Sequence, residues 1–297
     1  MSDFDIQNGV LVSYRGKDKH VVLPGGITTI ATFAFVCSEV ESVEVSEGVT
    51  GIKIGAFRNC YELETINLPD SLLYIENDAF AFCKSLQYYE YDGALYLGND
   101  NNPYLALIRA NRERTEKDVF HADTKVIGYS ALYDCNNLVD VVIPEKVRGI
   151  SGNGFLVCKA MRSITIPNSV IYIGEGAFRF CKSLSKVVVP EQFAENNSAW
   201  WKERFEAKVL PIIALDNFDK NAPLTKYILR DKVALVEALI SLERTELVHK
   251  ALEYSAKIKP EVLDKLIETA TDNNCAEVVD ALIKYKNKYY SSTKSKK

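Results

Sequence analysis

A unit that returns about every 23 residues limits the possible folds of this chain more than any other feature. Its best-preserved copy runs from Ile173 to Pro190, and weaker copies surround Phe155 and Phe57. A single unit of this length cannot bury its own apolar side, whereas several stacked units share a continuous core. The sequence therefore predicts a solenoid.

The third copy shows how one unit is built. Ile66 and Leu68 alternate with a polar residue, which is the period of a strand with one buried face. Pro69 has no amide hydrogen and ends the strand, and Leu72 and Ile75 begin a second short extended stretch. We expect parallel strands that pair from coil to coil, about eight in one ladder. We also expect an internal aromatic column of Phe57, Phe80, Phe155 and Phe178.

The cysteines follow the same period. Six of the seven occupy one register of the repeat: Cys37, Cys60, Cys83, Cys135, Cys158 and Cys181. Three interpretations compete, namely a small residue that fills a narrow turn, a set of disulfides, and a zinc site. The spacing favours the first, because stacked coils place every neighbouring pair alike and an odd count leaves one thiol over. No C-x-x-C pair and no histidine at ligand spacing supports zinc.

The repeat is interrupted once and then gives way to a helical pattern. The interval from Cys83 to Cys135 is one repeat plus an insert with two strand-like runs around an Asn/Asp/Pro turn. After Glu191, Trp200 and Trp201 lie in a helical pattern that could close the open end of the array. We expect an N-terminal cap (1–20), the array (21–190) with a hairpin insert (about 92–118), a capping helix and linker (191–220), a bundle of about five short helices (221–290) and a basic tail (291–297).

The unit I-x-x-I-G-x-x-A-F-x-x-C-x-x-L-x-x-[IV]-x-[IVL]-P resembles the BspA-type leucine-rich repeat over about residues 21–190. This resemblance implies an α/β protein: a right-handed leucine-rich-repeat solenoid with a parallel β-ladder, followed by a small all-α helical domain. In that domain, Leu235–Ile240 and Val278–Ile283 are similar to ankyrin-type helices, although the ankyrin turn motif is absent. The resemblance also implies a role in binding other proteins, often at the cell surface.

Composition and motifs argue against several other functions. The net charge of −4 is too mild to favour nucleic acid or an acidic membrane surface. No apolar run is long enough for membrane insertion, and the N-terminus lacks a signal peptide, so we expect a cytoplasmic protein if Met1 is the natural start. The alternative is a location at the cell surface or outside the cell, as the resemblance to this family implies for many of its members. We find no catalytic motif and expect no enzyme activity, cofactor or metal site.

Function is therefore expected on the outward positions that vary between copies. The candidate partner surface comprises Glu44, Asn67, Tyr74, Glu90, Val142, Thr165, Tyr172 and Val188. Our first hypothesis is a non-enzymatic module that binds a protein partner along the sheet face, where part of this surface is apolar. The alternative is a carbohydrate or surface-polymer binder that stacks sugar rings on Tyr74, Tyr88, Tyr89, Tyr91 and Tyr172.

Overall fold

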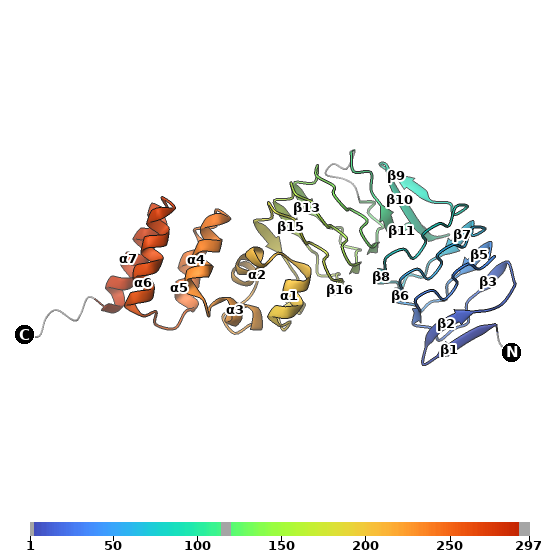
Figure 1. The fold of residues 1–297 in the computed structure, drawn as a ribbon, viewed down its shortest axis with the longest axis horizontal. Coiled ribbons are helices and arrows are strands. Elements are labelled where there is room, and N and C mark those ends of the chain that lie inside the picture. Colours follow the sequence, from blue (N-terminus) through green and yellow to red (C-terminus); the bar gives the residue numbers. More distant parts are fainter. Residues whose placement is uncertain (1–2, 114–119, 291–297) are drawn as a thin grey trace, which may run out of the picture. The chain divides into compact units, whose positions relative to one another are not determined.

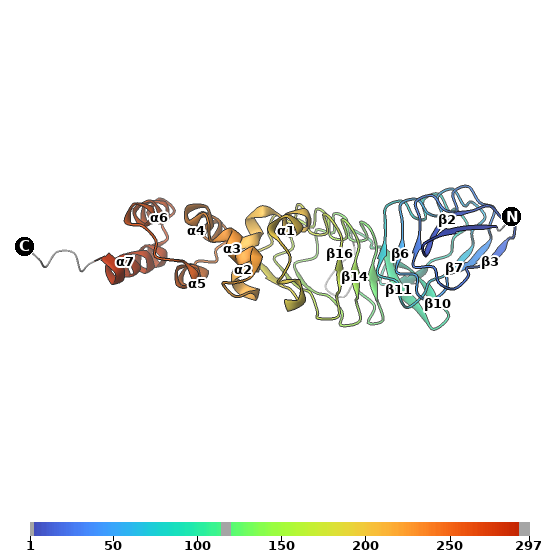
Figure 2. The ribbon, with the colours of Figure 1, turned by 90° about the horizontal axis from the view of Figure 1, so that it is seen from below.

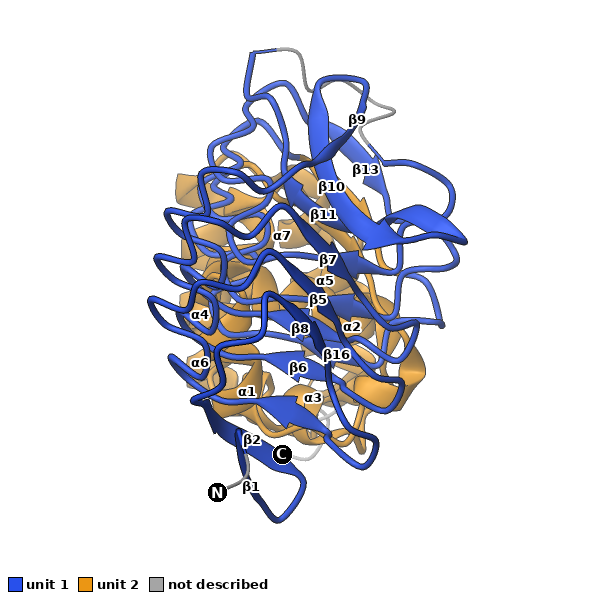
Figure 3. Ribbon diagram, turned by 90° about the vertical axis from the view of Figure 1, so that its right-hand side faces the viewer, with its two compact units in different colours: residues 1–161, 167–182 blue, residues 162–166, 183–297 orange. Residues whose placement is uncertain are grey.

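The computed structural model describes residues 3–113 and 120–290, which divide into two compact units. Unit 1 comprises residues 1–161 and 167–182, and unit 2 comprises residues 162–166 and 183–297 (Figure 3). Unit 1 is a β-solenoid of stacked coils, whereas unit 2 joins two strands to a series of helices (Figure 1). The expected solenoid with parallel pairing, followed by helices, is confirmed.

Two parallel ladders run through the first coils of unit 1. One contains β3 (His20–Val22), β5 (Ser42–Glu44) and β7 (Thr65–Asn67). The other contains β2 (Val10–Tyr14), β4 (Thr29–Ile30), β6 (Gly51–Ile52) and β8 (Tyr74–Ile75). In β5 the middle residue, Val43, is buried while Glu44 is exposed, so the alternation in the sequence sets which side chains enter the core.

The aromatic column is present and extends beyond the predicted residues. The Phe35 and Phe57 rings stack with centroids 4.8 Å apart, and Phe57 and Phe80 follow at 5.5 Å. Phe155 and Phe178 form a second stack at 5.2 Å. These side chains are buried, and they form the centre of each coil.

The cysteines are free thiols, as the spacing favoured. Four of the buried ones donate hydrogen bonds to carbonyls of the preceding coil, for example from Cys60 Sγ to Phe35 O (3.0 Å) and from Cys181 Sγ to Phe155 O (3.2 Å). Cys37 is an exception to the predicted column. The first repeat is one residue shorter, so Cys37 occupies the left-handed turn position that Asn59 has in the next coil, and its thiol is exposed.

This difference predicts a sharp split in thiol reactivity. In native reduced protein, Cys37 should react with Ellman's reagent within seconds to minutes, and Cys275 more slowly because it is half-buried. The other five thiols should react only after denaturation, because their side chains are buried and the reagent cannot reach them. Cys37→Ser should abolish the fast phase alone. Rapid native reaction of all seven thiols would contradict this packing.

An N-terminal hairpin begins unit 1, as expected for the cap. β1 (Phe4–Gln7) pairs antiparallel with β2, and the Asn8-Gly9 turn between them has positive φ at both residues. This is the geometry that favours Asn-Gly in two-residue hairpin turns. Tyr14 at the end of β2 stacks on Phe35 at 4.9 Å, so the hairpin also covers the first ring of the aromatic column.

The insert forms an antiparallel hairpin of β10 (Ala94–Asn99) and β11 (Asn102–Arg109), as predicted. The repeat period also predicts that residues 88–91 form the next strand of the first ladder, but these residues do not pair with β7. β9 (Tyr89–Tyr91) instead pairs antiparallel with β10, across an Asp92-Gly93 turn with positive φ at both residues. The first ladder therefore ends at β7.

The array resumes on the other side of the hairpin. β11 pairs in parallel with β12 (Val126–Ile127), which is followed by β14 (Gly149–Ile150) and β16 (Tyr172–Ile173). Gly149 lies so close to the Leu73 carbonyl that a Cβ atom would approach its oxygen to 1.7 Å. The two halves of the array thus meet at a position that requires glycine. The expected continuous ladder of eight strands is wrong, since the insert divides it into separate sheets. The repeat period predicts that the ladder resumes at Val119, which lies outside the described residues.

Unit 2 begins with β15 (Ser163–Thr165) and β17 (Lys186–Val188), which pair in parallel. The helices of the unit follow these strands (Figure 2). Helix α1 (Ser198–Arg204) follows, capped by the side chain of Asn197, and its Trp201 is buried against Phe205 and Phe218. The linker expected near residues 209–220 is wrong, because helix α2 (Leu210–Asn217) occupies it. Residues 210–215 are all buried, and a helix that is apolar all round shows no helical period in the sequence.

Helix α2 contacts the outer edge of β17. Asn217 Nδ2 donates to Val187 O (2.8 Å), and its Oδ1 accepts from Val189 N (3.0 Å). One amide side chain therefore provides the donor and the acceptor that another coil would supply. Helix α2 thus protects this strand edge from pairing with other chains.

Five further helices follow among the described residues, as predicted: α3 (Pro223–Ile228), α4 (Lys232–Ser241), α5 (Leu247–Tyr254), α6 (Pro260–Asp272) and α7 (Ala276–Tyr290). Pro223 and Pro260 lie in the first turns of α3 and α6, where a missing N–H costs nothing. The similarity to ankyrin helices has no further support. The predicted basic tail, residues 291–297, lies outside the described residues.

Candidate functional site on the first sheet

A groove of about 530 Å³ runs over the outer face of β3, β5 and β7 in unit 1. We call it the β7 groove. Its floor is the first ladder, and its closed end is formed by the chain around Tyr88 and Tyr89 and by Leu97 to Asp100 of the insert hairpin. The groove exists because the insert turns the chain away from the ladder after β7 and places β10 beside it.

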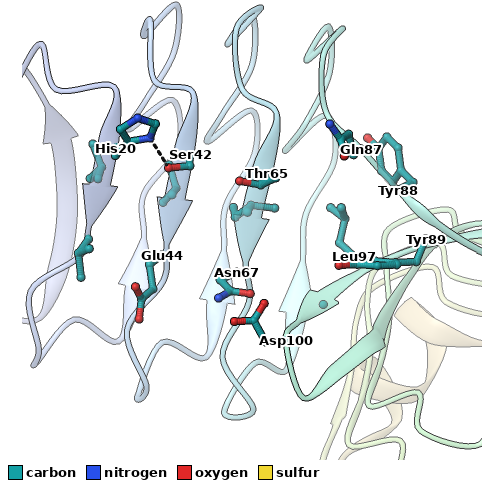
Figure 4. A pocket seen from close by; sticks show the side chains of 15 residues that line it. His20, Ser42, Glu44, Thr65, Asn67, Gln87, Tyr88, Tyr89, Leu97 and Asp100 are labelled. Carbon is teal, nitrogen blue, oxygen red and sulfur yellow. Dashed lines mark hydrogen bonds between the residues drawn. The ribbon is translucent and has the colours of Figure 1, made fainter.

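Two parallel rows of side chains line the groove (Figure 4). The first residues of the strands give one row, His20, Ser42 and Thr65, which Gln87 continues. The third residues give the other row, Glu44 and Asn67, which Asp100 of the hairpin continues. Parallel strands lie about 4.8 Å apart, so neighbouring groups in a row are separated by about that spacing. The second row begins with an apolar residue, because Val22 is the third residue of β3.

Most of these polar side chains are available to a ligand. His20 Nδ1 lies 2.9 Å from Ser42 Oγ. Within residues 3–113 and 120–290, the side chains of Glu44, Asn67 and Asp100 make no hydrogen bond or ion pair. Tyr89 is 50% exposed, whereas burial raises the pKa of Tyr88, which packs against the core. The groove therefore offers an acidic row, a neutral row and one exposed ring.

The serine–histidine pair in the groove does not resemble a catalytic pair. A histidine that activates serine is normally oriented by a third group on its other nitrogen. In the part of the chain that the structure describes, the other nitrogen of His20 has no such partner. No group of three or more His, Cys, Asp or Glu among those residues could hold a metal ion. The geometry is suited to hydrogen bonding with a ligand.

The structure brings together only part of the predicted partner surface. Glu44 and Asn67 lie opposite each other on β5 and β7 and both line the groove. Glu90 was expected in the same row, but it lies on β9 and faces Leu95 of the hairpin in the register of that pair. The row fails there because the insert redirects the chain after Gln87.

The remaining predicted residues lie elsewhere. Tyr74 and Tyr172 stack on each other at 4.9 Å, and each is half-buried. Val142 on β13 (Asp140–Val142) is 69% exposed in unit 1. Thr165 and Val188 lie opposite each other on β15 and β17 in unit 2. The tyrosines of the glycan hypothesis are also dispersed, since Tyr91 packs edge-on against His121 at 4.9 Å.

Several lining residues were not selected from the sequence. His20, Ser42 and Thr65 occupy an outward row that the strand period predicts, but nothing in the repeat distinguishes this row from the next. Asp100 could not be placed, because it reaches the groove only through the fold of the hairpin. One available signal was overlooked: Asp92-Gly93 is a strong hairpin signal, and it indicates that β9 leaves the ladder.

Comparison with known proteins identifies the array. Residues 13–96 and 111–209 match the BspA type Leucine rich repeat region in six copies, which covers more than half of the chain. The chain belongs to the BspA-type leucine-rich-repeat family. Family membership suggests a protein-interaction or binding module. A search of curated proteins finds no match.

Solved structures of bacterial leucine-rich-repeat proteins are also similar to this BspA-type chain. The T. pallidum protein TpLRR shares 28% identity over 61% of this chain and 75% of its own, with a TM-score of 0.30. A protein from Eubacterium ventriosum shares 19% identity (TM-score 0.32; 60% of this chain, 65% of its own). One from Bacteroides ovatus shares 21% identity (TM-score 0.29; 65% of each chain). This chain thus spans just under two thirds of the latter two.

Family membership does not support the cytoplasmic expectation, because BspA-type proteins are often surface-exposed or secreted. No helix among the described residues is both long and apolar enough to span a bilayer. The compartment of this protein therefore stays a prediction.

Proposed function

We propose that this BspA-type chain is a non-enzymatic module that binds a protein partner through the sheet face of its first coils. The observation that carries the proposal is the β7 groove, a concave site in which the side chains of Glu44, Asn67 and Asp100 have no partner among the described residues. Binding sites are typically concave and have a few convergent polar groups. This placement replaces the apolar part of the predicted surface, which we call the apolar stripe and which includes Val142 and Val188 in the sequence-based row, as the preferred surface.

The glycan alternative has less support in the arrangement of the tyrosines. Stacking on a sugar requires an open ring face, and several rings aligned along a polymer. Tyr74 and Tyr172 cover each other, and Tyr91 contacts His121, so Tyr89 is the most exposed ring of the five. A glycan array that shows Tyr89-dependent binding would restore this alternative.

Two outward residues at the same strand position allow a matched test of the site. Asn67 is the third residue of β7 in the groove, and Val142 is the third residue of β13 outside it. Asn67→Arg should weaken binding of a captured partner about thirtyfold or more, since a central contact is worth about 2 kcal/mol. Val142→Asp should leave binding within about twofold, since peripheral contacts contribute little.

The measurement is affinity purification from native cells with full-length bait, followed by titration of the purified partner against each variant. Circular dichroism establishes that the variants fold. Loss of binding by Val142→Asp with retention by Asn67→Arg would place the site on the apolar stripe instead. Retention by both variants would remove the sheet face from consideration.

A further inference from the structure

The acidic row of the β7 groove gathers hydrogen-bond acceptors that have no donor. Glu44 and Asp100 lie on either side of Asn67 in this row (Figure 4). Within the described residues, neither carboxylate has a cation or hydrogen-bond donor as partner. An ionised carboxylate accepts hydrogen bonds only, so these two groups favour a ligand that is rich in donors.

The floor of the groove adds a backbone acceptor. Thr65 N donates to Glu41 O (3.3 Å), and Asn67 O accepts from Val45 N (3.0 Å). Thr65 and Asn67 therefore direct their backbone groups toward β5. In a parallel ladder alternate residues face opposite neighbours, so Ile66 directs its N–H and C=O to the other edge of β7.

Although β10 lies beside β7, no strand among the described residues pairs with β7 at Ile66 along that other edge. On one side of it, Gln87 N donates to Glu64 O (2.9 Å), and on the other side Leu68 N donates to Gly98 O (2.9 Å). Between these two bonds the chain leaves the ladder toward β9, and β7 pairs only with β5. The C=O of Ile66, which lines the groove, is therefore left without a strand partner.

The surrounding coils are strongly acidic. Residues 36–100 contain 12 aspartates and glutamates but only 3 lysines and arginines, whereas the whole chain carries a net charge of −4. A concave surface of one charge sign concentrates ligands of the opposite sign and accelerates their association. The wider potential and the local acceptors thus favour the same kind of ligand.

We propose that the acidic row of the β7 groove binds an arginine side chain of the partner, a refinement that rests on the protein-binding function proposed above. A guanidinium group is planar, always charged, and carries five N–H donors and no acceptor. It can therefore donate to a carboxylate of the acidic row and to a neighbouring acceptor at the same time. The exposed Tyr89 ring at the closed end can stack on its face, which a compact ammonium group does less well.

The test uses the full-length protein and two probes of nearly the same shape, Ac-Gly-Gly-Arg-Gly-Gly-NH2 and the same peptide with citrulline, in which a neutral urea oxygen replaces one guanidinium nitrogen. Backbone amide shifts of β5, β7 and residues 97–100 are followed by NMR. The arginine peptide should bind at least about tenfold more tightly than the citrulline peptide, because charge-assisted hydrogen bonds are roughly twice as strong as neutral ones.

Glu44→Gln and Asp100→Asn should each weaken binding of the arginine peptide about threefold to tenfold. Glu62→Gln, an exposed carboxylate outside the groove, should not.

Each outcome has a defined meaning. Arginine-selective shifts at Ile66 and Asn67 that fade in the Glu44 and Asp100 variants support the proposal. Equal binding of the citrulline peptide, shifts confined to other surfaces, or no shifts at all would overturn it. These results leave the protein-binding function itself intact, because that function is decided by the Asn67→Arg and Val142→Asp titrations.

Discussion

Phe57→Ala is expected to destabilise unit 1 by about 3–5 kcal/mol, the cost of truncating a fully buried phenylalanine. The Phe57 side chain is 0% exposed and lies between the rings of Phe35 and Phe80. Its removal leaves a cavity in the middle of the aromatic column and breaks both ring contacts. Neighbouring coils cannot collapse into the cavity freely, because backbone hydrogen bonds such as Phe57 N to Ala79 O (2.8 Å) fix their spacing.

Phe82 provides a matched control in the next coil. It is 56% exposed, so Phe82→Ala should change the stability by less than about 1 kcal/mol. Phe57→Leu should have an intermediate cost, because Leu132 occupies the equivalent position of a later coil. The measurement is urea denaturation followed by far-UV circular dichroism. Equal losses of stability in Phe57→Ala and Phe82→Ala would contradict the prediction that the buried aromatic column stabilises unit 1.

The features that the sequence predicted correctly are those that each repeat determines locally. The Ala-Phe pair and the strand-proline ending recur in most coils, so the positions of Phe57 and Phe178 follow from the period alone. Likewise, the helices after Pro223 have one apolar stripe each, which the helical period detects. These elements need no knowledge of distant contacts.

The features that were missed depend on contacts between distant segments. The sequence of helix α2 shows no helical period because residues 210–215 are all buried. Only the segments packed around it distinguish this helix from an apolar linker. The β7 groove depends on Gly98 replacing a strand residue beside Leu68, a contact between segments 30 residues apart. The predicted row that includes Glu44, Asn67 and Glu90 was therefore assigned to a regular ladder that the insert interrupts before Glu90.

Arg244→Met is expected to destabilise unit 2 by about 2–4 kcal/mol, since it leaves charged and polar partners unpaired in a largely buried site. Arg244 lies between α4 and α5, and its side chain is only 19% exposed. Nη1 donates to Ser185 O (2.8 Å) just before β17, and Nη2 donates to both oxygens of Asp216 on α2 (2.9 and 2.8 Å). Although burial opposes the charge, the hydrogen bonds to Glu246 and Asp216 raise the pKa of Arg244. One side chain thus joins the last coil, α2 and the helices that follow.

Tryptophan fluorescence can report this effect, because Trp200 and Trp201 both belong to unit 2 and are the two tryptophans of the chain. Arg244→Lys should recover less than half of the lost stability, since one ammonium nitrogen cannot replace the three guanidinium nitrogens that donate separately to Ser185, Asp216 and Glu246. Arg230→Ala, an exposed arginine on the same unit, should stay within about 0.5 kcal/mol of wild type. A double-mutant cycle with Asp216→Asn should show a coupling of about 1–2 kcal/mol, as expected for directly bonded charges. A coupling near zero would mean that Arg244 acts through packing of its aliphatic stem and not through its guanidinium group.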